Sequence, residues 1–454
     1  MRDTARHERP SDAFASRRGL ASSAATVDGV LVLFVATAGV LANGLRIPLG
    51  EAGAPVGLTQ FLAFAGSACL IARWGLRREV GGVLVVLLGT LAFMAYFSLF
   101  HVDVSASLNR VGASGLRLFV LLGILVGMRR LSVVGRIQTV AIAGSAVLVI
   151  ALVTQALGMG VVAASDSAFG IASSANGVTS TAGALLVGQP VGVVPGSEVS
   201  LTAGVVVISC LAMLMGGLGL TPRGRLWPVT GVAISTMAML VAGTRIVPVA
   251  VLVALGVAAV HQLAHGARTR PHVFSLAVLV VVAVAAWGLA SAGGLMSSQQ
   301  LQARWDRPDS SLGLRADIWA AAIVSIEHRP VVGWGPGQVP YALQYSGPGV
   351  SGKSPNAHND ILTWAAEWGV LVAFVYVGLL LIAGVWAWRL VEWWFIAFVA
   401  FFCVSSAFWP TLSNFYSADA FLFAVGFVAI AATPLPDLAP AAADERSAAG
   451  GPTR

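Results

Sequence analysis

Residues 354–360, with the sequence SPNAHND, stand directly before an apolar run and hold the side chain best suited to acid–base chemistry. Serine followed by proline is typical of a helix start, so we expect Ser354 as the N-cap and Pro355 in the first helical position. His358 would then lie in the first turn, where free backbone N–H groups favour a neutral imidazole and a nearby anion. A neutral imidazole is a ready general base. The alternative is a histidine that only caps the helix or lies at the membrane interface.

Arg315 and Arg245 are candidates for binding an anion beside this histidine. The guanidinium group of an arginine can donate two hydrogen bonds to the oxygens of one phosphate, and it stays charged. Arg245 ends an apolar run with the sequence GTR at 243–245, whereas Arg315 lies in the polar stretch before the histidine. Two arginines and a helix N-terminus on one face would suit a pyrophosphate. The alternative is that arginines at helix ends only reach toward the membrane surface. Arg110 and Arg117 are a further pair that could share a helical face.

Residues 347–354, GPGVSGKS, match the phosphate-binding pattern G-x-x-x-x-G-K-[ST] in full. That pattern binds nucleotides only between a strand and a helix of an α/β domain. Here it lies in a loop too short for such a domain, and Pro355 follows directly, so nucleotide hydrolysis is not expected. Glycine N–H groups and Lys353 before a helix start could still help to hold a lipid-linked phosphate.

Acidic residues accompany these groups without forming a metal-binding pattern. The sequence has no H-E-x-x-H motif, and its three cysteines all fall in apolar runs. We therefore expect no metal, cofactor or disulfide framework. Asp317 and Glu367 are interpreted as partners of arginines.

The elements that must position these residues are membrane helices. Of 454 residues, 57% are hydrophobic and 10% are charged, whereas soluble domains carry about 25% charged residues. Apolar runs near the ~20 residues that cross a bilayer recur along the chain. Because these runs do not alternate polar and apolar residues, they are helices rather than barrel strands. We predict an all-α polytopic membrane protein of about 12 transmembrane helices, near 27–42, 55–72, 80–100, 115–128, 138–158, 201–220, 227–242, 246–263, 273–294, 361–388, 393–410 and 415–432.

Arginine placement predicts the orientation of these helices. Arginines gather in the N-terminal tail and in every second connection, at Arg73, Arg77, Arg78, Arg129, Arg130, Arg136, Arg223, Arg225, Arg268 and Arg270. Both termini are then cytoplasmic and the long polar loop is extracytoplasmic. The net charge of +7 needs no nucleic acid to explain it, since arginines facing the cytoplasm account for most of it.

The chain divides into one membrane domain with tails and a large loop. We expect an amphipathic helix from Arg315 to Glu327 in that loop, followed by a rigid turn at 333–337 with the sequence GWGPG. The predicted segments are a disordered cytoplasmic tail at 1–26, transmembrane helices one to nine at 27–294, the extracytoplasmic loop with short helices at 295–360, transmembrane helices ten to twelve at 361–433, and a second disordered cytoplasmic tail at 434–454.

In their order and predicted topology, these residues resemble the O-antigen ligase/polymerase family of bacterial membrane glycosyltransferases. The likeness begins with the arginine of GTR at 243–245 and continues with R-x-x-x-W in the large loop, from Arg315 to Trp319. A glycine-rich turn at 333–337 follows. The loop ends in His358-Asn359, with Gly369 ten residues beyond the asparagine.

The resemblance implies transfer of a glycan from an undecaprenyl-diphosphate carrier to an acceptor hydroxyl at the outer face of the bacterial inner membrane, without metal. His358 would take the proton of the acceptor hydroxyl, while Arg245 and Arg315 would neutralise the leaving diphosphate. The expected partners are this lipid-linked donor, a glycan or lipid-linked acceptor, and the bilayer. Ligation and polymerisation both stay open, as do the acceptor and the sugar. Further candidate site residues are Asn359, Lys353, Arg117 and Trp319.

Two other classes of protein stay open. A transporter or flippase of lipid-linked sugars would place ionisable residues near the membrane midplane, on broken helices. Here the charged groups collect in one external loop instead, which favours an enzyme. A non-catalytic scaffold of a polysaccharide export complex would not need a histidine at a helix start.

Overall fold

The structure is a computed structural model, and it describes residues 29–35, 37–38, 58–74, 88–89, 91–93, 95–96, 98–99, 104–129, 131–156, 196–215, 226–242, 246–264, 308–345, 357–389 and 393–408. Every regular element in this part of the chain is an α-helix, which confirms the predicted all-α class. The helices are α2 (Leu58–Trp74), α4 (Val104–Met128), α5 (Val133–Ala156), α7 (Gly196–Met215), α8 (Leu226–Ala242), α9 (Ile246–Ala264), α12 (Pro308–His328), α13 (Val339–Tyr345), α14 (Asp360–Trp368), α15 (Val370–Arg389) and α16 (Trp393–Phe408).

Three of the described helices are long and apolar enough to cross a membrane, namely Val134–Thr154 within α5, α9 and α15. Shorter apolar helices coincide with further predicted spans, among them Val199–Met215 and Trp393–Phe408. The chain is therefore an integral membrane protein. The total of about 12 spans stays a prediction, because the runs near 273–294 and 415–432 lie outside the described residues.

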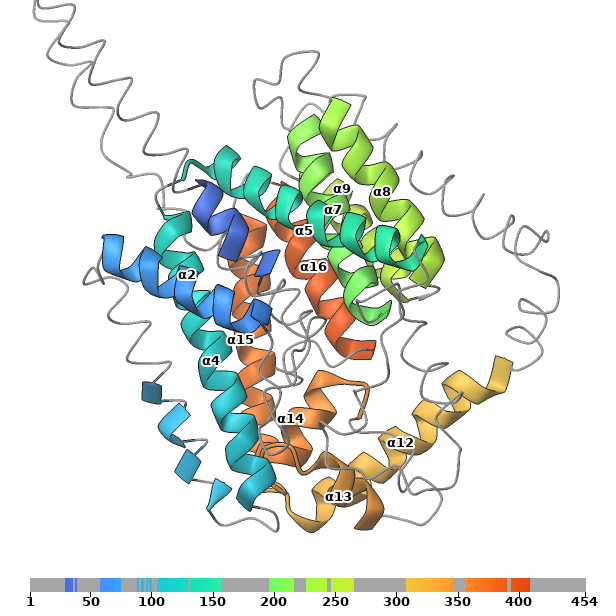
Figure 1. The fold of residues 1–454 in the computed structure, drawn as a ribbon. Coiled ribbons are helices and arrows are strands. Elements are labelled where there is room, and N and C mark those ends of the chain that lie inside the picture. Colours follow the sequence, from blue (N-terminus) through green and yellow to red (C-terminus); the bar gives the residue numbers. More distant parts are fainter. Residues whose placement is uncertain are drawn as a thin grey trace, which may run out of the picture.

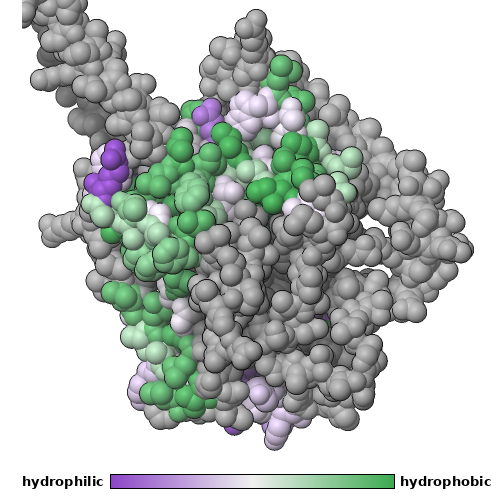
Figure 2. Space-filling view, viewed as in Figure 1, coloured by the Kyte–Doolittle hydropathy of each residue, from purple (hydrophilic) through white to green (hydrophobic). Residues whose placement is uncertain are grey.

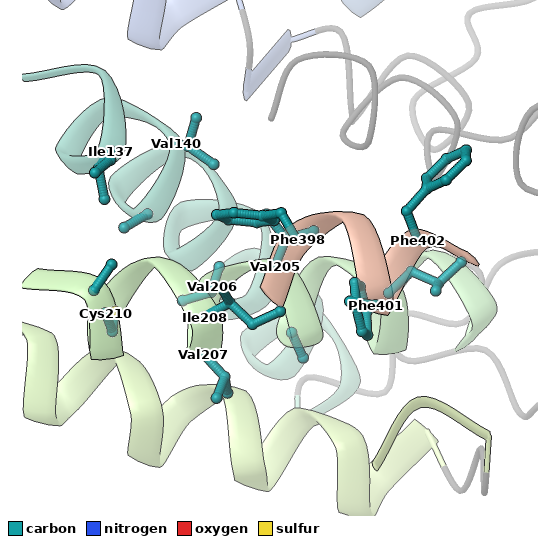
Figure 3. Packing of buried hydrophobic residues seen from close by; sticks show 14 of the residues in the cluster. Ile137, Val140, Val205, Val206, Val207, Ile208, Cys210, Phe398, Phe401 and Phe402 are labelled. Carbon is teal, nitrogen blue, oxygen red and sulfur yellow. The ribbon is translucent and has the colours of Figure 1, made fainter. Parts of the chain in front are cut away.

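The core is built where α7 packs against α5 and α8, and where α16 packs against α9. Figure 3 shows Ile208 of α7 among Val140 of α5 and Phe398 of α16. A Cβ at Gly204 would collide with the ring of Phe401, so the glycine lets α7 and α16 approach closely. Small residues at such contacts are typical of helices that pack inside membranes.

The described helices expose many apolar side chains. Figure 2 shows hydrophobic residues spread over the face that carries α2 and α4. On α15 the exposed side chains include Leu371, Phe374, Val375 and Ile382. An apolar surface this continuous fits contact with lipid rather than with water.

Helices α12, α13 and α14 lie together at one end of the bundle (Figure 1), and we call residues 308–345 and 357–368 the cap. The cap has its own small apolar core, which includes Ile318 of α12, Leu343 of α13 and Ala366 of α14. The helix predicted from Arg315 to Glu327 is confirmed and begins earlier, at Pro308. Helix α13 was not predicted.

One predicted span is interrupted. The run near 361–388 forms two helices, α14 and α15, which are separated at Gly369. Gly369 has φ +86, and a Cβ there would collide with the carbonyl of Val331. Only glycine fits this conformation at so close a backbone approach. The prediction of one continuous helix near 361–388 is therefore wrong.

Candidate functional site

His358 lies in a short bend, residues 357–359, which we call the hinge and which leads directly into α14. The N-cap of α14 is Asn359, whose side-chain oxygen accepts a hydrogen bond from the Leu362 N–H at 3.0 Å. The Thr363 hydroxyl donates to the Asn359 carbonyl at 2.8 Å. The expectation that His358 lies inside a helix capped by Ser354 is therefore wrong. His358 precedes the helix, because asparagine is an equally good N-cap and stands closer to the apolar run.

The hinge and the first residue of α14 are hydrogen-bonded to three other helices. The Trp319 indole N–H of α12 donates to the Ala357 carbonyl at 2.9 Å. The Asn359 side-chain amide donates to the Ala407 carbonyl of α16 at 2.9 Å. The Tyr376 hydroxyl of α15 donates to the buried Asp360 carboxylate at 3.2 Å. Sequence reasoning gave Trp319 and Asn359 as candidates, and these contacts show that both position the hinge.

His358 itself has a strained backbone, with φ +48, the one positive φ among the described non-glycine residues. This left-handed conformation costs about 1–3 kcal/mol in a non-glycine residue and persists only where the surroundings enforce it. The two hydrogen bonds from the hinge to α12 and α16, worth about 1 kcal/mol each, help to offset this cost. Strain of this kind collects at functional sites, so the bend makes His358 a candidate for a functional role.

The His358 ring is buried, with 2% of its surface exposed. Burial, together with the positive charge of Arg315, lowers the pKa of His358 from 6.5 to about 4. Both causes disfavour the imidazolium form. The imidazole is therefore neutral at physiological pH and able to accept a proton.

Arg315 carries the positive charge that helps to lower the pKa of His358. It lies on α12 one helical turn before Trp319, and residues four apart share a helical face. Because Trp319 holds the hinge, Arg315 is brought to the same region. Its Nε is buried and has no hydrogen-bond partner among the described residues, and burial lowers the pKa of Arg315. A buried guanidinium donor without a partner is an expensive feature that a bound anion would relieve.

The glycine-rich turn fastens the far end of α14. Gly333, Gly335 and Gly337 all have positive φ, and a Cβ at Gly333 would collide with the backbone of Glu367. The Gly335 N–H donates to the Glu367 carbonyl at 2.8 Å, and the Gly337 N–H donates to the Glu367 carboxylate at 3.0 Å. The predicted rigid turn is thus confirmed. Its role, to cap the C-terminal end of α14, was missed.

This order of elements can be compared with known families. Residues 230–377 match the O-antigen ligase family model. The predicted resemblance is thereby confirmed over a third of the chain, from α8 to the first turns of α15. No curated protein matches the chain. The match supports a membrane enzyme of the glycosyltransferase type.

The O-antigen ligase match contains the candidates of the large loop and the arginine before α9, but not Arg117. Arg245 and Lys353 lie outside the described residues, as does the side chain of Arg117 on α4. Their contacts with a ligand stay predictions. Trp319 contacts the hinge that contains His358 and Asn359, and Arg315 lies near enough to affect the pKa of His358.

Two features of the O-antigen ligase region had no clear sequence signal. Asp360 and Tyr376 form a buried pair between α14 and α15, although the sequence shows only an acid and an apolar span. Glu367 accepts a hydrogen bond from the Gly337 N–H, a contact that the sequence did not predict, and its pairing with an arginine stays a prediction. Within the described ranges, no group of three or more His, Cys, Asp or Glu side chains is arranged to hold a metal ion.

Proposed function

We propose that the protein is a membrane glycosyltransferase that moves a glycan from an undecaprenyl-diphosphate carrier to an acceptor hydroxyl at the extracytoplasmic face. The observation that carries this proposal is the hinge, where a buried neutral His358 lies within electrostatic range of Arg315. The residues suit a base and an anion-binding group side by side. The family match over 230–377 adds the substrate class, a lipid-linked glycan.

The proposed reaction is a single displacement at the anomeric carbon of the glycan. The acceptor oxygen forms a bond to that carbon as the bond to the diphosphate oxygen breaks. His358 receives the proton of the acceptor hydroxyl, and undecaprenyl diphosphate leaves with the bonding electron pair. Negative charge grows on the leaving diphosphate in the transition state, so a preorganised cation there accelerates the reaction.

Arg315 supplies that cation from α12. Its buried Nε would donate to a diphosphate oxygen, and the guanidinium keeps its charge even where burial lowers its pKa. Arg245 precedes α9 in the sequence and is proposed as the second contact. Lys353 lies shortly before the hinge in the sequence and is proposed as a supporting one.

The proposal is tested by replacing His358 in two ways. Both His358→Ala and His358→Asn remove the base, but asparagine tolerates a positive φ better than alanine does. We expect both variants to lose transfer by about 100-fold or more, since a general base contributes about 10²–10⁴. Transfer is measured as glycan joined to the acceptor by purified protein in liposomes.

The matched control is His328→Ala, an exposed histidine on α12 of the same cap. It should transfer like the unmodified protein. Full activity of His358→Asn, with only His358→Ala impaired, would mean that the hinge conformation matters and the imidazole does not, and would overturn the base assignment.

A further inference from the structure

The length of helix α15 allows the depth of neighbouring elements in the membrane to be estimated. Its 20 residues span about 30 Å at ~1.5 Å per residue, close to the thickness of the hydrocarbon core. Its side chains stay exposed and apolar up to the outer end, with Leu371 65% and Phe374 68% exposed. Val370, its first residue, therefore lies at one boundary of the hydrocarbon core.

Two hydrogen bonds relate positions in the cap to positions along α15. The Val370 N–H donates to the Pro330 carbonyl at 2.7 Å, so the turn formed by residues 329–332 lies level with the start of α15. The Tyr376 hydroxyl reaches Asp360 beside the hinge. Because Tyr376 is six residues into α15, the hinge lies about 9 Å deeper than the turn.

The turn at 329–332 has the surface chemistry of a membrane interface. Val331 is 65% and Val332 is 49% exposed, although both are apolar. Behind them the Arg329 guanidinium stacks over the Trp334 ring at 4.4 Å, and Trp334 lies 5.1 Å from the exposed Tyr345. Trp334 is buried, so the exposed groups of this surface are the two valines and Tyr345; an apolar tip beside an exposed tyrosine is typical of segments at a membrane interface.

We propose that the turn at 329–332 inserts into the headgroup layer of the outer leaflet and holds the cap against the bilayer. The lipid-exposed surface of α15 continues directly into Val331 and Val332, because the turn is hydrogen-bonded to the first residue of that helix. The cap is then a monotopic part of a polytopic protein, seated on the membrane by its own side chains.

A consequence follows for the site, and it rests on the function proposed above. With the turn at this boundary of the hydrocarbon core, His358 lies about 9 Å further toward the middle of the bilayer, below the level of the lipid phosphates. A lipid-linked diphosphate would then reach Arg315 without lifting its chain out of the leaflet. Only the acceptor has to approach from the water.

The experiment uses spin labels on the full chain in liposomes of phosphatidylethanolamine and phosphatidylglycerol. Val331→Cys and Val332→Cys are labelled one at a time, with Cys69, Cys210 and Cys403 replaced by alanine. Collision with oxygen, which concentrates in lipid, is compared with collision with a water-soluble nickel chelate. Phe374→Cys gives the lipid reference, and Asp317→Cys on the exposed face of α12 gives the reference for the aqueous side.

We expect labels at 331 and 332 to collide with oxygen almost as often as the label at 374, and several-fold less often with nickel than the label at 317. Labels at both positions that match the one at 317 would overturn the proposal and place the turn in water. Labels shielded from both reagents would also overturn it, because another protein surface would then cover the turn. The two positions are read independently, so one poorly folded variant does not decide the result. No glycan is present, so a failed transfer assay leaves this measurement unaffected.

Discussion

At the scale of single residues, the central feature is a histidine kept neutral by its surroundings. A pKa of about 4 makes His358 fully available as a base at neutral pH but intrinsically weak. A general base works best with a pKa near the working pH. Binding of the proposed donor would raise the pKa of His358 toward the working pH. Its diphosphate beside Arg315 would offset the positive charge that helps to lower that pKa.

This reasoning predicts the pH dependence. In the free enzyme His358 is deprotonated above about pH 4, so kcat/KM should stay nearly level from pH 7 to about 5 and fall below that. In the donor complex the nearby anion favours the protonated form, so the acidic limb of kcat should lie at higher pH than that of kcat/KM. Both limbs are measured with purified protein. An acidic limb of kcat/KM near 6.5 would contradict a buried, unprotonated base.

A second prediction concerns Arg315. Arg315→Lys keeps the charge but loses the planar fork, so transfer should fall about 10- to 100-fold. The loss should appear in kcat as well as in donor affinity, because charge on the diphosphate grows in the transition state. Arg389→Lys, an exposed arginine at the other end of α15, is the matched control. Equal rates for both variants would make Arg315 a structural residue.

At the scale of elements, the cap depends on a backbone fit between the glycine turn and α14. Gly333→Ala should detach the turn, because φ is +66 and the new Cβ would collide with the Glu367 backbone. We expect a loss of at least ~1 kcal/mol in the stability of the cap and faster proteolysis within 329–338. Gly378→Ala is the control, since a Cβ there meets nothing within 4 Å. Equal protease resistance of the two variants would contradict this account.

Sequence patterns predicted the loop helix and the glycine turn because both follow from local rules of spacing and backbone freedom. The break at Gly369 was not predictable in this way. Apolar residues continue through it, and the break is stabilised by a distant partner, the Pro330 carbonyl. The sequence offered both Ser354 and Asn359 as N-caps, and a distant contact of Asn359 accompanies the start of α14 after Asn359. The Asn359 amide is held by Ala407 of α16, a contact that no local pattern contains.

The arrangement of the candidate site also depends on contacts between residues that are far apart in the sequence. Sequence order placed Arg315 and His358 in one loop, but their approach depends on the Trp319 hydrogen bond to Ala357. The pair Asp360 and Tyr376 had no signal at all, because a tyrosine in an apolar span is ordinary. The residue types alone indicated which chemical roles were possible. The packing contacts that bring these residues together could not be predicted from the sequence.

At the scale of the whole molecule, the candidate residues that the structure describes, among them Arg315 and His358, gather at one end of an apolar bundle. The described spans pack through small and aromatic residues, and the hinge, Arg315 and the glycine turn all belong to the cap or join it to α15 (Figure 1). A transporter needs a polar site that both sides of the membrane can reach in turn. His358 and Arg315 lie together in the cap, and this arrangement fits the proposed transfer at one side of the membrane instead.

The most direct test therefore separates bond transfer from transport. Purified protein in liposomes is given an undecaprenyl-diphosphate-linked oligosaccharide and a soluble glycan acceptor, with a chelator present. The amounts of free undecaprenyl diphosphate and of newly formed glycosidic bonds are both measured. The account predicts one free undecaprenyl diphosphate for each new glycosidic bond, with neither formed by His358→Asn. Movement of the intact lipid-linked oligosaccharide between leaflets, with no diphosphate released, would contradict it.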